Sequence, residues 1–232
     1  MMILVPQGAE HRAVRRGLRR VGLSSDWICP IPIGSSTLRS HLEHYHQHHA
    51  CEAGESVIVA GVCGSLSPDL HIGDAVVCRS CMTLPEHASA EVIQCDRPLT
   101  DALVQALEPQ VDLVNALTSD RLIWSASEKR ALGQTHHADI VDMEGHAALA
   151  LLHQWEMKVA ILRVVSDDCF YDLPDLNPAI DARGDLQPLP LTKELITHPV
   201  AALRLIRGSL VGLNALERRI SQVFTSLPSD YC

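Results

Sequence analysis

Short, continuous apolar runs alternate along the chain with segments in which apolar residues recur at helical spacing. The runs are rich in β-branched residues, which is typical of strands that are covered on both faces of a sheet. They predict strands at residues 3–5, 55–60, 75–78, 111–114, 140–143 and 159–165. Helical spacing predicts helices at residues 10–20, 98–107, 127–132 and 144–154, and a long last helix from Pro199.

The last predicted helix carries one apolar stripe, which we expect to pack on the body of the protein. The stripe consists of Val200, Leu203, Ile206, Leu210, Leu213, Leu216, Ile220 and Val223. Thr197 is the expected N-cap, and Pro199 falls in the first turn, where proline is tolerated. The preceding residues 171–192 contain four prolines and are predicted to form an irregular loop.

The alternation of strands and helices predicts an α/β fold with a central, mixed or mostly parallel sheet flanked by helices. The sequence contains no internal repeat, low-complexity linker or charge block. We therefore expect a single domain over residues 1–232.

Composition and charge narrow the class of protein. Hydrophobic residues make up 47% and charged residues 20%, as in globular domains. A net charge of −9 argues against nucleic acid as a partner. No uninterrupted apolar run approaches the ~18–20 residues that cross a bilayer. The apolar stretch before Pro6 is too short for a signal peptide, so we expect a cytoplasmic protein whose eight cysteines are reduced.

Two groups of residues resemble metal sites, but the sequence favours a simpler interpretation of each. Cys78 and Cys81 lack a second ligand pair, so we expect small buried side chains rather than bound zinc. His41, His44 and His48 would share a helical face that binds metal only adventitiously. No metal and no cofactor are therefore predicted.

The first predicted helix carries a run of arginines, namely Arg12, Arg15, Arg16, Arg19 and Arg20. One interpretation is a solvated face that pairs with the protein's own acidic residues. The other is contact with anionic lipid headgroups, which would suit a membrane-associated lipid nucleoside as substrate. The sequence leaves both open, and the helix lacks the large apolar anchors that insertion needs.

Three of the predicted strands end in residues suited to chemistry. A glycine-rich segment, 61–66, follows the second strand and is predicted to form a turn. Asp142 and Glu144 follow a later strand, and Ser166 and Asp167 follow the strand at 159–165. Ligands of open α/β sheets bind beyond the carboxyl ends of strands, where such carboxylates act as acids, bases or hydrogen-bond acceptors.

These segments, in this order, resemble the nucleoside phosphorylase and nucleosidase superfamily. The matching segments are Gly61-Val-Cys-Gly-Ser-Leu66 with Ile72-Gly-Asp-Ala-Val-Val77, then Val141-Asp-Met-Glu144, then Arg163-Val-Val-Ser-Asp167. The resemblance implies that family's fold, cleavage of the N-ribosidic bond of a purine nucleoside and assembly into a homo-oligomer.

The resemblance also implies roles for residues around the base and the sugar. Asp167 would protonate or hydrogen-bond N7 of the leaving purine, and Ser166 would help to orient it. Glu144 would accept hydrogen bonds from the ribose hydroxyls, with Met143 against the sugar face. An acid near the base and carboxylates near the sugar stabilise the charges that develop as the bond breaks.

On the nucleophile side, Glu10 stands where nucleosidases place the glutamate that activates water. The residues that would line the water or phosphate site are Val62, Cys63 and Gly64. Val59 and Val62 occupy the places where related phosphorylases offer an arginine and a serine to phosphate. Hydrolysis is therefore the leading expectation, with phosphorolysis as the alternative.

The remaining matches concern the base and the 5′ substituent. Asp120-Arg-Leu122-Ile123 resembles the base-binding loop, with Leu122 in the place of a stacking aromatic residue. The segments 127–132, 141–144 and 172–174 resemble a hopanoid-biosynthesis group that removes adenine from adenosylhopane. A non-catalytic nucleoside- or lipid-binding protein on the same scaffold is the alternative from another class. The presence of all three carboxylates, Glu10, Glu144 and Asp167, favours an enzyme.

Overall fold

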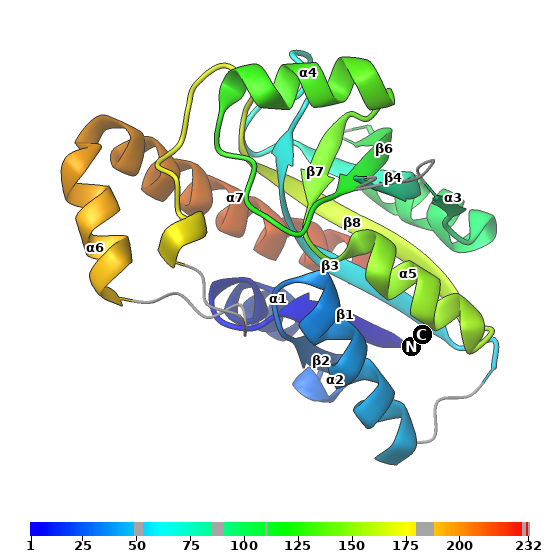
Figure 1. The fold of residues 1–232 in the computed structure, drawn as a ribbon. Coiled ribbons are helices and arrows are strands. Elements are labelled where there is room, and N and C mark those ends of the chain that lie inside the picture. Colours follow the sequence, from blue (N-terminus) through cyan, green and yellow to red (C-terminus); the bar gives the residue numbers. More distant parts are fainter. Residues whose placement is uncertain (49–52, 85–90, 110, 180–187, 229–230, 232) are drawn as a thin grey trace.

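The computed structural model describes residues 1–48, 53–84, 91–109, 111–179, 188–228 and 231. Strands and helices alternate along the chain, as Figure 1 shows. The strands are β1 (Met2–Pro6), β2 (Ile28–Ile31), β3 (Ser56–Ser65), β4 (Ala75–Thr83), β5 (Val92–Gln94), β6 (Asp112–Thr118), β7 (Ile140–Asp142) and β8 (Lys158–Asp167). The α-helices are α1 (Ala9–Arg20), α2 (Ser35–His48), α3 (Arg97–Leu107), α4 (Ala126–His136), α5 (Gly145–Gln154), α6 (Pro188–Thr197) and α7 (Pro199–Ser226), and two short 3₁₀ turns are η1 (Ser25–Trp27) and η2 (Asn177–Ala179).

The strands form one mixed sheet with the order β2-β1-β3-β7-β6-β4-β5, and β8 pairs with both β3 and β4. The pairing of β3 with β8 is parallel, whereas β8 with β4 and β3 with β7 are antiparallel. Together with the parallel pairs β4–β6 and β6–β7, these contacts close β3, β8, β4, β6 and β7 into a ring. The predicted α/β fold with a mixed central sheet is confirmed.

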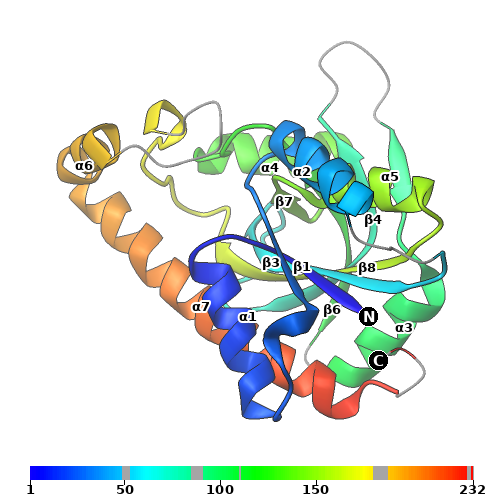
Figure 2. The same cartoon turned by 90° about the horizontal axis from the view of Figure 1, so that it is seen from below.

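Helices cover both faces of the sheet, and the alternation of side chains along β3 shows how. Val57 and Val59 belong to the hydrophobic cluster that α2 and α5 close. Ile58 and Ala60 belong to the second cluster, closed by α1, α3 and α7. Figure 2 shows these two groups of helices on opposite sides of the central strands. This double burial explains why the strands were visible as continuous apolar runs.

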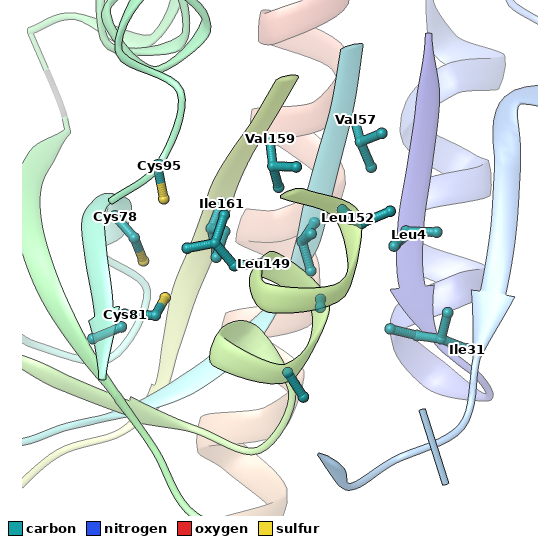
Figure 3. Close-up of a cluster of buried hydrophobic side chains, with 14 of the residues drawn as sticks. Leu4, Ile31, Val57, Cys78, Cys81, Cys95, Leu149, Leu152, Val159 and Ile161 are labelled. Atoms are coloured by element: carbon teal, nitrogen blue, oxygen red, sulfur yellow. The ribbon is translucent and has the colours of Figure 1, made fainter. Parts of the chain in front are cut away.

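The cysteines are part of the first cluster. Figure 3 shows Cys78, Cys81 and Cys95 among the aliphatic side chains beside α5. Cys78 and Cys81 are fully buried, which confirms the prediction that they are core residues. Hydrogen bonds of the Cys81 thiol with Cys78 and Cys95, together with burial, hold the pKa of Cys81 well above its usual value. Cys51 and Cys232 lie outside the described residues.

Several local predictions were wrong. Residues 61–65 continue strand β3 instead of forming a turn, because β8 and β7 extend its hydrogen-bonded ladder. Helix α6 occupies part of the predicted loop 171–192. The residue before α7 is His198 rather than Thr197, whose hydroxyl donates to the Glu194 carbonyl. Strands β2 and β5 were missed.

The longest helix, α7, has two halves that differ. Leu216, Ile220 and Val223 pack into the second cluster, as predicted. The first half contradicts the prediction of a single packed stripe, because Val200, Leu203, Ile206 and Leu210 are 50–67% exposed. By length and composition alone, α7 is apolar enough to cross a membrane, although 28% of its most apolar window is buried. Its C-terminal half is held against the sheet.

Candidate active site

The pairing of β3 with β8 brings two of the predicted segments side by side. Gly61 lies opposite Arg163, and Gly64 lies opposite Asp167, with a bulge between Cys63 and Gly64. Strand β7 pairs with β3 at Gly64 and leads directly into Glu144. All three segments therefore meet. Gly61 and Gly64 mark two levels along β3, the first level and the second level, which the rise of a strand separates by about 10 Å.

At the first level, a fully buried arginine holds a group of carboxylates. The Nε and Nη2 atoms of Arg163 donate hydrogen bonds to Oδ2 of Asp142 over 3.0 and 2.6 Å. Its Nη2 also lies 3.6 Å from Oε2 of Glu144. Burial acts to lower the pKa of Arg163, but Asp142, Glu144 and Glu10 outweigh it and raise that pKa. Arg163 is therefore a fixed positive charge at the centre of the group.

Two of these carboxyls have pKa values near neutrality. Burial raises the pKa of Glu10 to about 7, opposed by the Val62 N–H, which donates to Oε1 over 2.7 Å, and by Arg163. Burial likewise raises the pKa of Glu144 to about 8; Arg163 opposes the rise, and Asp142 adds to it. The Gly34 N–H donates to Oε1 of Glu144 over 3.3 Å. General bases work best with pKa values in this range.

Gly61 is required where it stands. A Cβ atom at this position would collide with Nη1 of Arg163 and lie 2.8 Å from Oε1 of Glu10. That Nη1 atom is buried and has no hydrogen-bond partner among the described residues. A buried guanidinium donor without a partner is costly. Its position beside the Glu10 carboxyl suits a small polar molecule that would satisfy it.

At the second level, Asp167 forms a buried ion pair with Lys129 of α4. Lys129 has no exposed surface, and its Nζ also donates to the Asp168 carbonyl over 3.2 Å. The Ser166 hydroxyl lies 2.9 Å from Oδ2 of Asp167 and 3.2 Å from the Cys63 carbonyl. A Cβ at Gly64 would lie 2.9 Å from Oδ1 of Asp167. This carboxylate is therefore held in one orientation.

Some of the predicted substrate-binding residues lie at the edge of this arrangement. The Met143 carbonyl accepts a hydrogen bond from the Ser35 hydroxyl over 3.3 Å, which ties α2 to the segment before Glu144. Leu122 is half-buried, and its backbone is fixed by two hydrogen bonds to the Asn177 side chain. Ile123 is buried in a small hydrophobic cluster, so its side chain contributes to packing.

Sequence reasoning assigned no specific role to Arg163 or Lys129, and it marked Asp142 only as one of several carboxylates at strand ends. A lone arginine within the apolar run 159–165 was an available signal, because an unpaired charge on a doubly buried strand is prohibitively costly. Lys129 gave no comparable signal. It stands in a polar helical segment, and only the fold shows that its ammonium group points inward.

Residues 44–176, more than half of the chain, match the family described as the Phosphorylase superfamily. The chain belongs to this superfamily. No curated protein matches the sequence. The superfamily consists of enzymes, nucleoside phosphorylases and nucleosidases, which confirms the predicted class.

Solved structures similar to this superfamily member come from distant relatives. Futalosine hydrolase of Helicobacter pylori strain 26695 superposes with a TM-score of 0.68 at 15% identity over 97% of each chain. The 5′-methylthioadenosine/S-adenosylhomocysteine nucleosidase of the same organism gives 0.68 at 16% identity over 97% of this chain and 98% of its own. The Arabidopsis thaliana 5′-methylthioadenosine nucleosidase gives 0.69 at 15% over 98% and 96%. These similarities establish the fold.

The charged side chains of the candidate site in this superfamily member are carboxylates, a lysine and an arginine. Within the described ranges, no three His, Cys, Asp or Glu side chains are placed to hold a metal ion. The histidines of the segment 41–48 lie on α2, where His44 and His48 contact each other, and His49 is outside the described residues. The chemistry available at the site is that of carboxylates, a lysine and an arginine.

The raised pKa values predict how activity depends on pH. A base must be deprotonated to act, and the pKa of Glu10 is raised to about 7. The value of kcat/KM should therefore fall as the pH drops below about 7. It should rise as the pH increases through the pKa values of Glu10 and Glu144, about 7 and about 8. Because these groups interact, the apparent pKa values belong to the pair. A profile that stays flat from pH 5 to 8 would contradict this assignment.

Proposed function

We propose that this protein cleaves the N-ribosidic bond of a 5′-substituted purine nucleoside, with adenine as base and water as nucleophile. The observation that carries the proposal is the pair of charged groups about 10 Å apart along β3 and β8. One group, around Arg163, suits the sugar and the nucleophile. The other, Asp167 with Lys129, suits the leaving base.

On the nucleophile side, Glu10 and Arg163 would hold the water. The unpartnered Nη1 of Arg163 would donate to the water oxygen, and Glu10 would take its proton as the oxygen attacks C1′ of the ribose. Glu144 would accept hydrogen bonds from the ribose hydroxyls and oppose the positive charge that develops on the sugar. Donors and acceptors fixed before the reaction stabilise such charge most effectively.

On the base side, the Lys129–Asp167 pair would hold the proton that the base needs. In the ion pair the transferable proton lies on the ammonium group of Lys129, which is paired with Oδ1 of Asp167. As the C1′–N9 bond breaks, its electron pair moves onto the purine, N7 takes a proton through Asp167, and Asp167 takes that proton from Lys129. Lys129 is left neutral and regains a proton from the solvent, to which Glu10 releases the proton of the attacking water. Ser166 would keep the carboxyl oriented. The products are the free base and the 5′-substituted ribose.

Replacing Glu144 with glutamine tests the sugar side. At a pH above about 8, where Glu144 is ionised, hydrogen bonds to this charged acceptor contribute ~1.5–3 kcal/mol, so kcat/KM for a ribonucleoside should fall by about tenfold to a hundredfold. The preference for ribose over 2′-deoxyribose should disappear in the same variant, as measured with matched adenosine and 2′-deoxyadenosine derivatives. Unchanged discrimination between the two sugars would remove Glu144 from the ribose site.

Product analysis distinguishes water from phosphate as the nucleophile. Phosphate needs cationic or N–H-rich partners. The Val59 side chain is buried in the core, Arg12 is an exposed residue of α1, and Glu10 would repel an anion. We expect free adenine and free 5′-substituted ribose at equal rates with and without phosphate. Phosphate-dependent release of a ribose 1-phosphate would favour the phosphorylase instead.

The nature of the 5′ substituent is a finer part of the proposal. The similarity of segments 127–132 and 172–174 to the hopanoid group makes adenosylhopane a candidate beside methylthioadenosine and S-adenosylhomocysteine. The Ala126 N–H donates to Asp172 over 2.7 Å, which ties one of these segments to the other. Comparing turnover of these three nucleosides would identify the preferred substituent. The homo-oligomer and the cytoplasmic location remain predictions.

A further inference from the structure

In the first half of α7, the large apolar side chains face the solvent instead of the core, which is the opposite of a normal surface helix. Its inward positions are the small residues Ala202, Gly208 and Gly212, whereas its large apolar side chains point outward. Leu203 is 67% exposed and Leu210 is 58% exposed. A helix that packs on a core places its large apolar residues inward. An outward apolar stripe on a soluble protein marks a surface that contacts another apolar phase.

Further exposed apolar side chains extend this stripe. Ile196 at the end of α6 is 73% exposed, and Val200 continues the stripe at the start of α7. Phe170 and Tyr171, in the segment after β8, are also about half exposed, and Arg204 lies 4.2 Å from the centre of the Tyr171 ring. Figures 1 and 2 show α6 and the first half of α7 extending beyond the sheet. We call this surface, residues 196–211 with Phe170 and Tyr171, the apolar face.

Arginines are concentrated on α7, which carries most of this face, and on α1, which packs on the C-terminal half of α7. Helices α1 and α7 contain nine of the 19 basic residues, all arginine, although the chain has a net charge of −9. Their two carboxylates are committed elsewhere: Glu10 belongs to the candidate site, and Glu217 is buried between Arg16 and Arg20 at 2.5 Å from each. Arg204 and Arg207 lie within the apolar face and are exposed.

We propose that the apolar face docks the protein on an anionic lipid bilayer, with its leucines and isoleucines below the headgroups and its arginines paired with lipid phosphates. Apolar side chains interspersed with arginines are the composition of helices that lie in the membrane interface. The arginines add attraction to anionic lipids. A second copy is the less suitable occupant, because a two-fold contact on this stripe would bring Arg204 and Arg207 close to their own symmetry copies.

The docked surface would lie directly behind the candidate site. A Cβ atom at Gly208 would collide with the Ser166 carbonyl oxygen, and one at Gly212 would lie 3.3 Å from the Ser166 Cα. The exposed helix therefore packs on the residue that precedes Asp167. The docking proposal is independent of the reaction, since it rests on the surface alone and is tested without substrate.

Flotation with vesicles tests the proposal. The wild-type protein should float with vesicles of equal parts phosphatidylglycerol and phosphatidylcholine, and more weakly with phosphatidylcholine alone. Leu203→Ser with Leu210→Ser should reduce the partition coefficient at least about tenfold. Arg204→Gln with Arg207→Gln should reduce it about fivefold per arginine on anionic vesicles only. These positions are exposed, so the fold should survive, which circular dichroism would verify.

Matched controls come from the opposite end of the molecule. Val92 on the edge strand β5 is 49% exposed, and Arg97 on α3 has an almost fully exposed side chain. Val92→Ser and Arg97→Gln should float as the wild type does. Sedimentation of the same samples without lipid shows whether a second copy of this chain covers the apolar face instead. Failure of the wild type to float, equal flotation of all variants, or an oligomer that only the leucine variant dissociates would each overturn the proposal.

Discussion

Replacing Asp167 with asparagine is expected to lower kcat by about 10²–10⁴-fold while the protein stays folded. The reason is that asparagine keeps the shape and the hydrogen bond to Ser166 but cannot carry the proton that the leaving base requires. Adenine release from a 5′-substituted adenosine measures the effect. Near-native turnover on the best substrate would remove Asp167 from the catalytic machinery.

The ion pair with Lys129 makes a second variant necessary. Asp167→Asn alone leaves the buried ammonium group of Lys129 without its counter-charge, and that could disturb the site indirectly. The double variant Asp167→Asn with Lys129→Met removes both charges. If loss of the carboxylate itself stops the reaction, the double variant should be as inactive as the single one. Recovery of activity in the double variant would show that the single substitution acted through Lys129.

Replacing Arg163 with methionine should produce the largest loss of stability. Arg163 is fully buried and is the positive charge shared by Asp142, Glu144 and Glu10. Removing one partner from such a buried group leaves uncompensated charge and costs about 3–5 kcal/mol of unfolding free energy. Urea unfolding at neutral pH measures the loss. A variant within about 1 kcal/mol of the wild type would show that the carboxylates are neutral in the folded protein.

Two further substitutions separate charge from geometry at this position. Arg163→Lys keeps the charge but loses the two hydrogen bonds that Nε and Nη2 donate to Oδ2 of Asp142, so it should recover only part of the stability. Arg163→Met with Asp142→Asn removes one of the orphaned negative charges and should be more stable than Arg163→Met alone. If the double variant were the less stable of the two, the hydrogen bonds that Asp142 accepts from the Thr118 hydroxyl and the Gly145 N–H would be the dominant contribution.

Much of the fold was predictable because the strands are buried on both sides. Short apolar runs rich in β-branched residues, such as 159–165 with its single Arg163, favour strands over helices. Strand β5 was missed because it is a short edge strand whose residues are partly exposed, so it has no apolar pattern. The turn predicted after Ala60 was wrong because glycine marks close approach as well as turns. Gly61 and Gly64 admit Arg163, Glu10 and Asp167 next to a strand backbone.

The candidate site was predictable only in part. Its carboxylates follow predicted strands, so the sequence placed them at one edge of the sheet. Their mutual arrangement depends on the β3–β8 register and on helices that are distant in the sequence. Both belong to the tertiary structure, which local sequence patterns do not specify. Lys129 illustrates the limit: thirty-eight residues separate it from Asp167, and nothing in its local pattern indicates burial. The outward stripe of α7 was misassigned for the related reason that periodicity defines a face but not what covers it.

Glu10 and Glu144 share Arg163, so protonation of the water-activating carboxyl is thermodynamically linked to binding of the ribose hydroxyls. Each carboxyl affects the other's proton affinity through the arginine and by direct repulsion. A ligand whose hydroxyls donate to Glu144 favours its ionised form, and by linkage this changes the protonation of Glu10. The effect is reciprocal: protonating Glu10 must change the affinity for the sugar by the same factor. Substrate binding should therefore be accompanied by net proton exchange with the solvent, of a size that varies with pH around neutrality.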